Sequence, residues 1–164
     1  MEKSIIVHSI DPVFDENSKI LILGSFPSVK SREQGFFYGH PQNRFWRVLS
    51  AVFKQKTPES IEEKRQFLLK NNVAVFDVIK ECEISGSADS SIKNAMPNDL
   101  SLILNGSKIT RIFTNGKLSH TLYNKYIFEK TGITDTCLPS TSPANAAFSL
   151  ERLVDEWKVI KVKI

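Results

Sequence analysis

Three consecutive aromatic residues between glycines, Gly35-Phe-Phe-Tyr-Gly39, are the most unusual feature of the sequence. Their spacing does not follow the apolar stripe of a helix, so we expect them in a loop. Aromatic rings in a loop can stack on a flat ring of a ligand, which stabilises binding by roughly 1–3 kcal/mol per ring. A hydrophobic anchor for the loop would use the same residues, and composition does not decide between the two interpretations.

A second candidate is the hydroxyl-rich segment Pro139-Ser-Thr-Ser-Pro143, which comes just before a predicted helix. The exposed N–H groups of a helix N-terminus and the neighbouring hydroxyls together suit a bound phosphate. A simple Ser or Thr cap of the helix is the alternative interpretation.

The rest of the sequence predicts the elements that must position these segments. Continuous apolar runs are typical of strands buried on both faces, whereas apolar stripes at helical spacing predict helices. Residues 25–41 are expected to form a loop, and residues 80–95 to be polar and irregular. Strands are predicted at 19–24, 73–77, 109–114 and 134–138, and helices at 43–53, 57–70, 97–106, 116–130 and from about 145.

Strands that alternate with helices predict a single α/β domain covering residues 1–164. The expected architecture is a three-layer α/β/α sandwich around a central four-stranded, mainly parallel sheet. In such sheets, ligands bind beyond the carboxyl ends of the strands. The loops that follow Gly24, Asp77, Thr114 and Leu138 should therefore form the functional site.

The chain has 164 residues, 41% of them hydrophobic and 24% charged, which is ordinary for one globular domain. Its two distant cysteines and three scattered histidines fit no metal-ligand spacing. The N-terminus has no long apolar run, and no stretch approaches the length of a membrane span. We therefore expect a cytoplasmic monomer that uses no metal, no cofactor and no membrane.

The net charge of +4 is unevenly distributed along the chain. Residues 1–100 contain 13 basic and 13 acidic residues, whereas residues 101–164 contain 9 and 5. A basic C-terminal part is compatible with phosphate binding, and also with a solvated basic face that binds nothing.

Three segments carry a resemblance to a known family: Leu23-Gly-Ser-Phe-Pro-Ser28, Tyr38-Gly-His-Pro-Gln-Asn-Arg-Phe-Trp46 and Leu138-Pro-Ser-Thr-Ser-Pro-Ala-Asn145. They resemble the uracil-DNA glycosylase superfamily, and most closely its hypoxanthine-DNA (deoxyinosine) glycosylase branch. With the Thr114-Asn-Gly116 turn, the resemblance spans roughly residues 19–164. It implies an enzyme that flips a deaminated base out of DNA and hydrolyses its N-glycosidic bond.

Two positions depart from the pattern of most of the superfamily. Phe26 stands where a water-directing Asn or Asp is usual, and Leu138 stands where the uracil-specific branch has a His. The hypoxanthine branch shares this loss and carries its catalytic amide later, which implies that Asn43 orients the attacking water. An Asn at the start of a helix is also a common N-cap, so a purely structural role for Asn43 stays open.

The resemblance implies roles for further loop residues. Asn115 presents a donor and an acceptor that could pair with the flipped base, Tyr38 would stack on the base, and Phe26 would wall the pocket. A turn-forming Asn-Gly pair is the alternative explanation for Asn115. The expected DNA- or phosphate-binding residues are Ser25, Ser28, His40, Lys117, Ser140, Thr141 and Ser142.

The implied function is that of a monofunctional DNA glycosylase that excises hypoxanthine during base excision repair. Hypoxanthine pairs imperfectly with thymine, so flipping it out of the stack costs less than flipping a well-paired base. Two alternatives stay open: the same chemistry on uracil or xanthine, and a catalytically silent module that binds damaged DNA.

Overall fold

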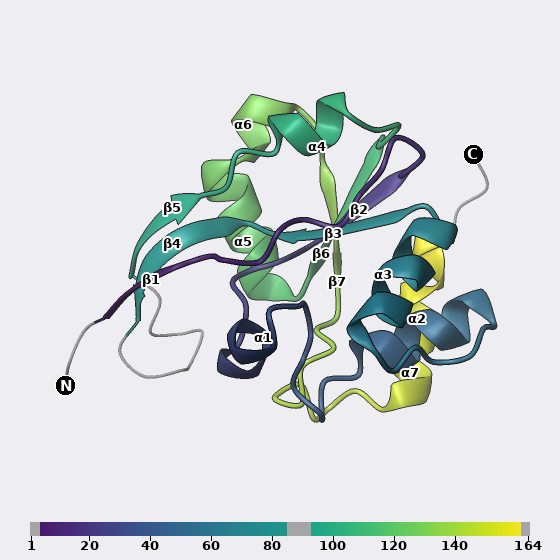
Figure 1. Cartoon of the computed structure of the whole chain (residues 1–164). Helices are drawn as coiled ribbons and strands as arrows, with labels where there is room; N and C mark the ends of the chain where they lie inside the picture. Colours follow the sequence, from purple (N-terminus) through teal and green to yellow (C-terminus); the bar gives the residue numbers. More distant parts are fainter. Residues whose placement is uncertain (1–3, 85–92, 162–164) are drawn as a thin grey trace.

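The computed structural model describes residues 4–84 and 93–161 (Figure 1). Its centre is a sheet in which all three strand pairs are parallel, in the order β3-β2-β6-β7. The neighbouring strands β2 and β3 are buried along their whole length because their residues are almost continuously apolar. The strands are β2 (Ile20–Gly24), β3 (Val73–Asp77), β6 (Arg111–Asn115) and β7 (Asp135–Leu138).

Helices lie on both sides of this sheet, so the predicted α/β architecture with a four-stranded parallel sheet is confirmed (Figure 1). On one side lie α2 (Phe45–Phe53), α3 (Ile61–Lys70) and α7 (Leu150–Trp157), and on the other lies α5 (Lys117–Tyr126). The short helices are α4 (Ser101–Asn105), α6 (Phe128–Thr131) and the 3-10 helix η2 (Lys158–Ile160).

The prediction of an irregular segment at 80–95 is wrong for its described part. β4 (Ile79–Ile84) and β5 (Lys93–Pro97) pair antiparallel, and β1 (Ser4–Val7) pairs with the other edge of β4. The three strands form a second sheet that extends from one side of the molecule (Figure 1). In β4 the buried residues Ile79 and Cys82 alternate irregularly with exposed and half-buried ones, and its pairing with β5 contains register shifts. Its sequence therefore lacks the apolar run of a fully buried strand.

Several helix boundaries also differ from the prediction. The expected loop 25–41 contains the short helix α1 (Val29–Gln34), which Ser28 caps by accepting a hydrogen bond from the Ser31 N–H. The helix expected from about 145 begins only at Leu150, after the cap Ser149. The helix expected over 116–130 is interrupted at Ile127, between α5 and α6.

The carboxyl ends of the parallel central strands lie at one edge of the sheet, and the segments that follow β2 and β7 lie at the bottom of Figure 1. There the chain after β2 contacts the chain after β7, since the Arg44 N–H donates to the Thr141 carbonyl over 3.0 Å. No helix in the described part of the chain has the length and apolar character that a membrane span requires.

Candidate active site

A pocket of about 400 Å³ lies at this edge, and the loops after β2, β3, β6 and β7 all contribute to its wall. The structure therefore brings together the four segments that the sequence predicts to meet. Nine of the eleven predicted site residues line the pocket: Ser25, Phe26, Ser28, Tyr38 and Asn43 from the first loop, and Asn115, Ser140, Thr141 and Ser142 from the later ones.

The side-chain oxygen of Asn43 is fully used by the protein. Oδ1 accepts a hydrogen bond from the Phe45 N–H (2.9 Å) and a second one from the Thr141 hydroxyl (2.8 Å). Because the Phe45 N–H can only donate, the atom that faces it must be Oδ1, and this fixes the orientation of the amide. Asn43 therefore presents its NH2 group, a donor, to the pocket.

Thr141 connects Asn43 to Asn115. Its hydroxyl accepts from Asn115 Nδ2 (3.0 Å), and its backbone N–H donates to Asn115 Oδ1 (3.0 Å). The side chain of Thr141 is completely buried, and both functions of its hydroxyl are occupied within the protein. In this arrangement Thr141 holds the Asn43 amide, and the Asn115 side chain holds Thr141.

Arg44, the residue after Asn43, fixes the loop that follows β7. Its guanidinium donates to the carbonyls of Ser142 (3.1 Å), Asn145 (3.0 Å) and Phe148. These bonds hold residues 142–148 in irregular turns, which explains why the last helix starts later than its sequence predicts. One dipeptide, Asn43-Arg44, thus positions both the amide and the opposite wall of the pocket.

The turn after β6 depends on a glycine at position 116. Gly116 has φ +97°, and a Cβ atom there would lie 3.1 Å from Ser140 Cβ. Glycine adopts this backbone conformation without strain and lets the loop after β7 approach closely. Gly116 therefore provides the turn, while Asn115 before it lines the pocket.

Tyr38 is held by stacking rather than by its hydroxyl. Its ring lies on that of Phe45, with centroids 3.8 Å apart and an angle of 12° between the planes. The hydroxyl is buried and has no hydrogen-bond partner among the described residues. Burial raises the pKa of Tyr38 well above its usual value, and the nearby Asp77 raises it further. The Asn115 side chain near the hydroxyl lowers the pKa only in part, so the phenol keeps its proton.

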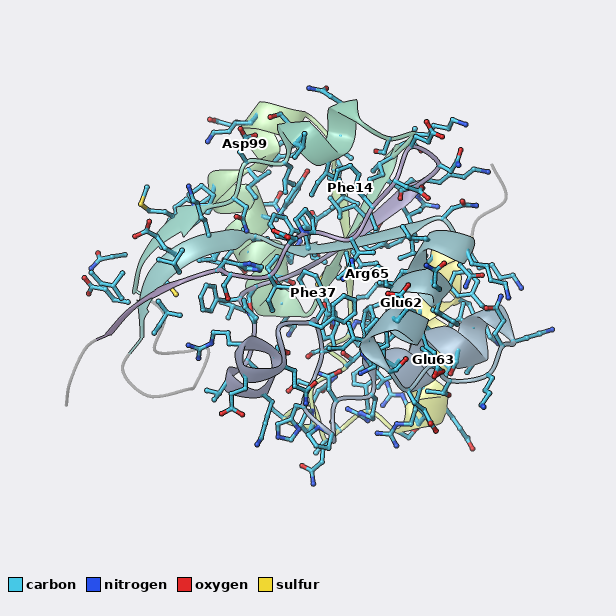
Figure 2. The ribbon with its side chains drawn as sticks, viewed as in Figure 1. Phe14, Phe37, Glu62, Glu63, Arg65 and Asp99 are labelled. Atoms are coloured by element: carbon cyan, nitrogen blue, oxygen red, sulfur yellow. The ribbon has the colours of Figure 1, made fainter. Side chains whose placement is uncertain are left out.

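Of the neighbouring aromatic residues, Phe36 and Phe37 are both 2% exposed and belong to the hydrophobic core. Figure 2 shows Phe37 in the interior, below the central strands. Phe36 stacks on Trp46 with centroids 6.1 Å apart, and Arg65 covers its ring. The sequence left open whether this segment anchors its loop or stacks on a ligand. Phe36 serves as a hydrophobic anchor, whereas Phe37 and Tyr38 also line the pocket.

Two predicted residues do not line the pocket. His40 lies in the loop before α2, where Nδ1 accepts a hydrogen bond from the Gln42 N–H (3.1 Å). Lys117 is exposed at the first turn of α5, two residues beyond Asn115. Both lie close in sequence to pocket residues, but neither contributes to the pocket wall.

The structure adds Asp77 and Arg32 to the pocket wall, and neither is among the predicted site residues. Asp77 ends strand β3 and is only 4% exposed. A carboxylate at the carboxyl end of a buried strand is a sequence signal that could have identified it. Arg32 lies in α1, with its guanidinium carbon 5.8 Å from the Phe26 ring centroid. Its short helix lies in a Ser-rich segment that was expected to be a loop, so no pattern in the sequence indicated that Arg32 belongs to the pocket.

The chain is similar to known proteins of one family. Residues 12–161 match the profile of the Uracil DNA glycosylase superfamily. The chain is 35% identical to a hypoxanthine DNA glycosylase of Methanosarcina acetivorans over 152 residues, covering 90% of this chain and 93% of the relative. It is 34% identical to a hypoxanthine DNA glycosylase of Methanosarcina barkeri over 110 residues, 66% of this chain and 70% of the relative.

A solved structure shows the same fold. The solution NMR structure of a candidate uracil DNA glycosylase from Methanosarcina acetivorans superposes with a TM-score of 0.79 at 30% identity, covering 97% of this chain and all of that one. The profile match covers most of the chain, and the resemblance carried by the loop motifs is confirmed. The chain belongs to the uracil DNA glycosylase superfamily.

Proposed function

We propose that this protein is a monofunctional DNA glycosylase that excises hypoxanthine from DNA. Two relatives of similar length carry the name hypoxanthine DNA glycosylase. The observation that carries the proposal is the Asn43 amide, fixed by Phe45 and Thr141 with its NH2 group toward a pocket at the carboxyl edge of the sheet.

The reaction follows from the groups that line the pocket. A flipped base enters between the aromatic wall of Phe26 and Tyr38 and the loop after β7, and the Asn43 NH2 group holds the attacking water by its oxygen. The C1′–N9 bond of the nucleotide breaks, the water oxygen bonds to C1′, and one water proton goes to the departing base. An amide cannot remove a proton efficiently, so the sugar must develop positive charge before the water attacks.

Among the residues that the structure describes, no lysine lines the pocket, which supports hydrolysis rather than an amine-linked intermediate. Lys117, the nearest candidate by sequence, is exposed outside the pocket wall. Without an amine near C1′, the sugar is attacked by water, and the product is an intact strand with an abasic site.

The structure also bears on the uracil-directed alternative. Phe26 is 8% exposed and Leu138 is 4% exposed, and neither side chain offers a hydrogen bond. Apolar side chains therefore stand where most of the superfamily has a water-directing Asn or Asp and where the uracil-specific branch has a His. We propose that uracil is at best a poor substrate.

The direct test uses duplexes that contain a single hypoxanthine, uracil or xanthine, followed by cleavage of abasic sites with alkali. Strand breaks confined to the hypoxanthine duplex are the expected result, with an undamaged duplex as the control. Breaks mainly in the uracil or the xanthine duplex would show that this base, and not hypoxanthine, is the preferred substrate. Tight binding without breaks in any duplex would show a silent binding module instead.

We further propose that the protein acts as a monomer on DNA that contains a deaminated base. Light scattering of the protein in the presence of one hypoxanthine duplex should give a 1:1 complex, whereas a 2:1 complex would contradict the proposal.

A further inference from the structure

A buried acidic group in the pocket has no part in the reaction described above. Asp77 Oδ2 lies 2.8 Å from His8 Nε2, and the two side chains are 5% and 2% exposed. His8 follows β1, and the pairing of Val7 with Glu81 in β4 brings it to the end of β3. A carboxylate buried this deeply is costly unless its oxygens are hydrogen-bonded, so its position in the wall requires an explanation.

The hydrogen bonds of His8 define which oxygen of Asp77 is available. His8 Nδ1 accepts from the Ile10 N–H (3.2 Å), so the ring proton is on Nε2 and is donated to Asp77 Oδ2. The other oxygen, Oδ1, has no donor among the described residues. Asp77 therefore offers one acceptor to the pocket, in an orientation that His8 fixes.

The Tyr38 hydroxyl lies beside this oxygen. A Cβ atom at position 24 would collide with Asp77 Oδ1 and would lie 3.2 Å from Tyr38 Oη, so both atoms pack over the bare backbone of Gly24. Among the described residues, Tyr38 Oη is buried without a hydrogen-bond partner, and the hydrogen bonds of Asp77 use Oδ2 and the backbone carbonyl rather than Oδ1. The wall of the pocket thus holds a neutral O–H donor next to a carboxylate acceptor, and neither atom has a partner in the described part of the chain.

We propose that Tyr38 Oη and Asp77 Oδ1 recognise a carbonyl group next to a ring N–H on the flipped base. In hypoxanthine these are O6 and N1–H, so Tyr38 donates to O6 and Asp77 accepts from N1–H. In adenine, the parent base, the 6-amino group donates and N1 accepts, so both hydrogen bonds are reversed. The pair therefore distinguishes the deaminated base from its parent at two adjacent positions.

His8 contributes to this selection as a positioning residue. By holding Oδ2, it limits Asp77 to one free oxygen and prevents a bidentate contact with the N1–H and 2-amino groups of guanine. The inference deepens the proposed function and rests on it, because it assigns base recognition within the same pocket. A site built to hydrogen-bond its substrate rejects analogues that leave its polar groups unpaired.

The Asp77→Asn variant gives a sharp prediction, because His8 would fix the orientation of the new amide. Its Oδ1 would accept from His8 Nε2, and its Nδ2 would present a donor to the base. Single-turnover excision of hypoxanthine opposite thymine should fall by about 100-fold, and adenine opposite cytosine should become detectably excised. Asp155→Asn, the same change on the exposed face of α7, should behave like the wild type.

A modified substrate tests the inference without any change to the protein. The wild type should not excise 1-methylhypoxanthine, which keeps O6 but has a methyl group in place of the N1 proton. Tyr38→Phe should slow hypoxanthine excision by about 10-fold without creating activity on adenine, because it removes a donor and supplies no acceptor.

The outcomes separate this inference from the proposed function. If the wild type excises hypoxanthine and also 1-methylhypoxanthine at a similar rate, Asp77 does not recognise N1–H and the inference is overturned. Equal hypoxanthine rates for the wild type and a folded Asp77→Asn variant would overturn it too. If the wild type does not release hypoxanthine at all, the proposed function itself fails.

Discussion

At the scale of single residues, the Asn43 amide has one end used by the protein and the other end free. Oδ1 accepts from the N–H of Phe45, the first residue of α2, and from the Thr141 hydroxyl, so Asn43 caps the start of the helix although Arg44 holds the N-cap position. Nδ2 is the part that remains for a ligand. The cap and the proposed catalytic group are therefore two ends of the same side chain.

The Asn43→Ala variant should lose turnover while its affinity for a hypoxanthine duplex stays within a few-fold of the wild type. Loss of the cap should lower the free energy of unfolding by about 1 kcal/mol. Single-turnover excision and equilibrium binding of the same duplex measure the two effects separately.

The Asn43→Ser variant separates the cap from the amide. Serine is a good N-cap and can keep an oxygen near the Phe45 N–H, but it has no NH2 group. We expect stability close to that of the wild type and turnover as low as in Asn43→Ala. Full activity in Asn43→Ser would show that Asn43 is only a cap.

The motif residues of the site could be predicted from the sequence because each lies in a recognisable segment. The structure places three of them in the pocket wall: Tyr38, Asn43 and Asn115. Their hydrogen bonds and ring stacking could not be predicted, because a linear pattern does not show which side chains meet in space. The contact of His8 with Asp77 joins residues 69 positions apart. It depends on a strand pairing that the sequence does not predict.

At the scale of elements, the loop after β7 and the start of α2 act as one unit. Thr141 Oγ1 takes a hydrogen bond from Asn115 at the end of β6 and gives one to Asn43 just before α2. A change at this buried hydroxyl should therefore alter catalysis by moving Asn43, although Thr141 itself need not touch the substrate.

The Thr141→Val variant tests this link, since valine keeps the shape of threonine and lacks the hydroxyl. The rate of hypoxanthine excision should fall by about 10- to 100-fold, since small displacements of a positioning group are costly, while the affinity for DNA changes little. Thr141→Ser keeps the hydroxyl and should restore most of the rate. If serine and valine have equal rates, the hydroxyl does not position Asn43.

Arg44 provides a second test at this scale, because it binds three carbonyls of the loop 142–148. Arg44→Lys cannot reproduce the planar arrangement of donors, so the free energy of unfolding should fall by about 2 kcal/mol. Hydrogen exchange should accelerate within residues 142–148. Arg47→Lys, on the exposed side of α2, is the matched control and should change neither measurement.

The elements that could be predicted are those whose burial leaves a plain pattern. The central strands are apolar throughout, and the stripe of α2 includes Phe45, Trp46 and Leu49. β1, β4 and β5 belong to a sheet in which exposed and buried residues mix, with register shifts between β4 and β5. α1 has six residues, too few for an apolar stripe to be recognised.

At the scale of the whole molecule, the positive charge of residues 101–164 remains a prediction about DNA binding. Lys117 is the clearest exposed candidate near the pocket, because it lies two residues beyond Asn115 at the start of α5. A lysine that contacts phosphate contributes to affinity on any sequence and makes binding depend on salt.

The Lys117→Ala variant should bind hypoxanthine and undamaged duplexes more weakly by a similar factor. The slope of log affinity against log salt concentration should decrease by about 1, and the excision rate at saturating protein should not change. Lys70→Ala, at the end of α3 and therefore toward the opposite edge of the sheet, is the control. Equal slopes for the wild type and Lys117→Ala would exclude a phosphate contact.

The proposed activity of the protein is tested most directly by identifying the released base. The wild type is incubated with a duplex that contains one deoxyinosine, and free bases are quantified by mass spectrometry together with the abasic sites formed. We predict free hypoxanthine in equal amount to abasic sites, and neither product with Asn43→Ala. A bound duplex that yields no free hypoxanthine, or an Asn43→Ala variant that releases it at the wild-type rate, would contradict the account.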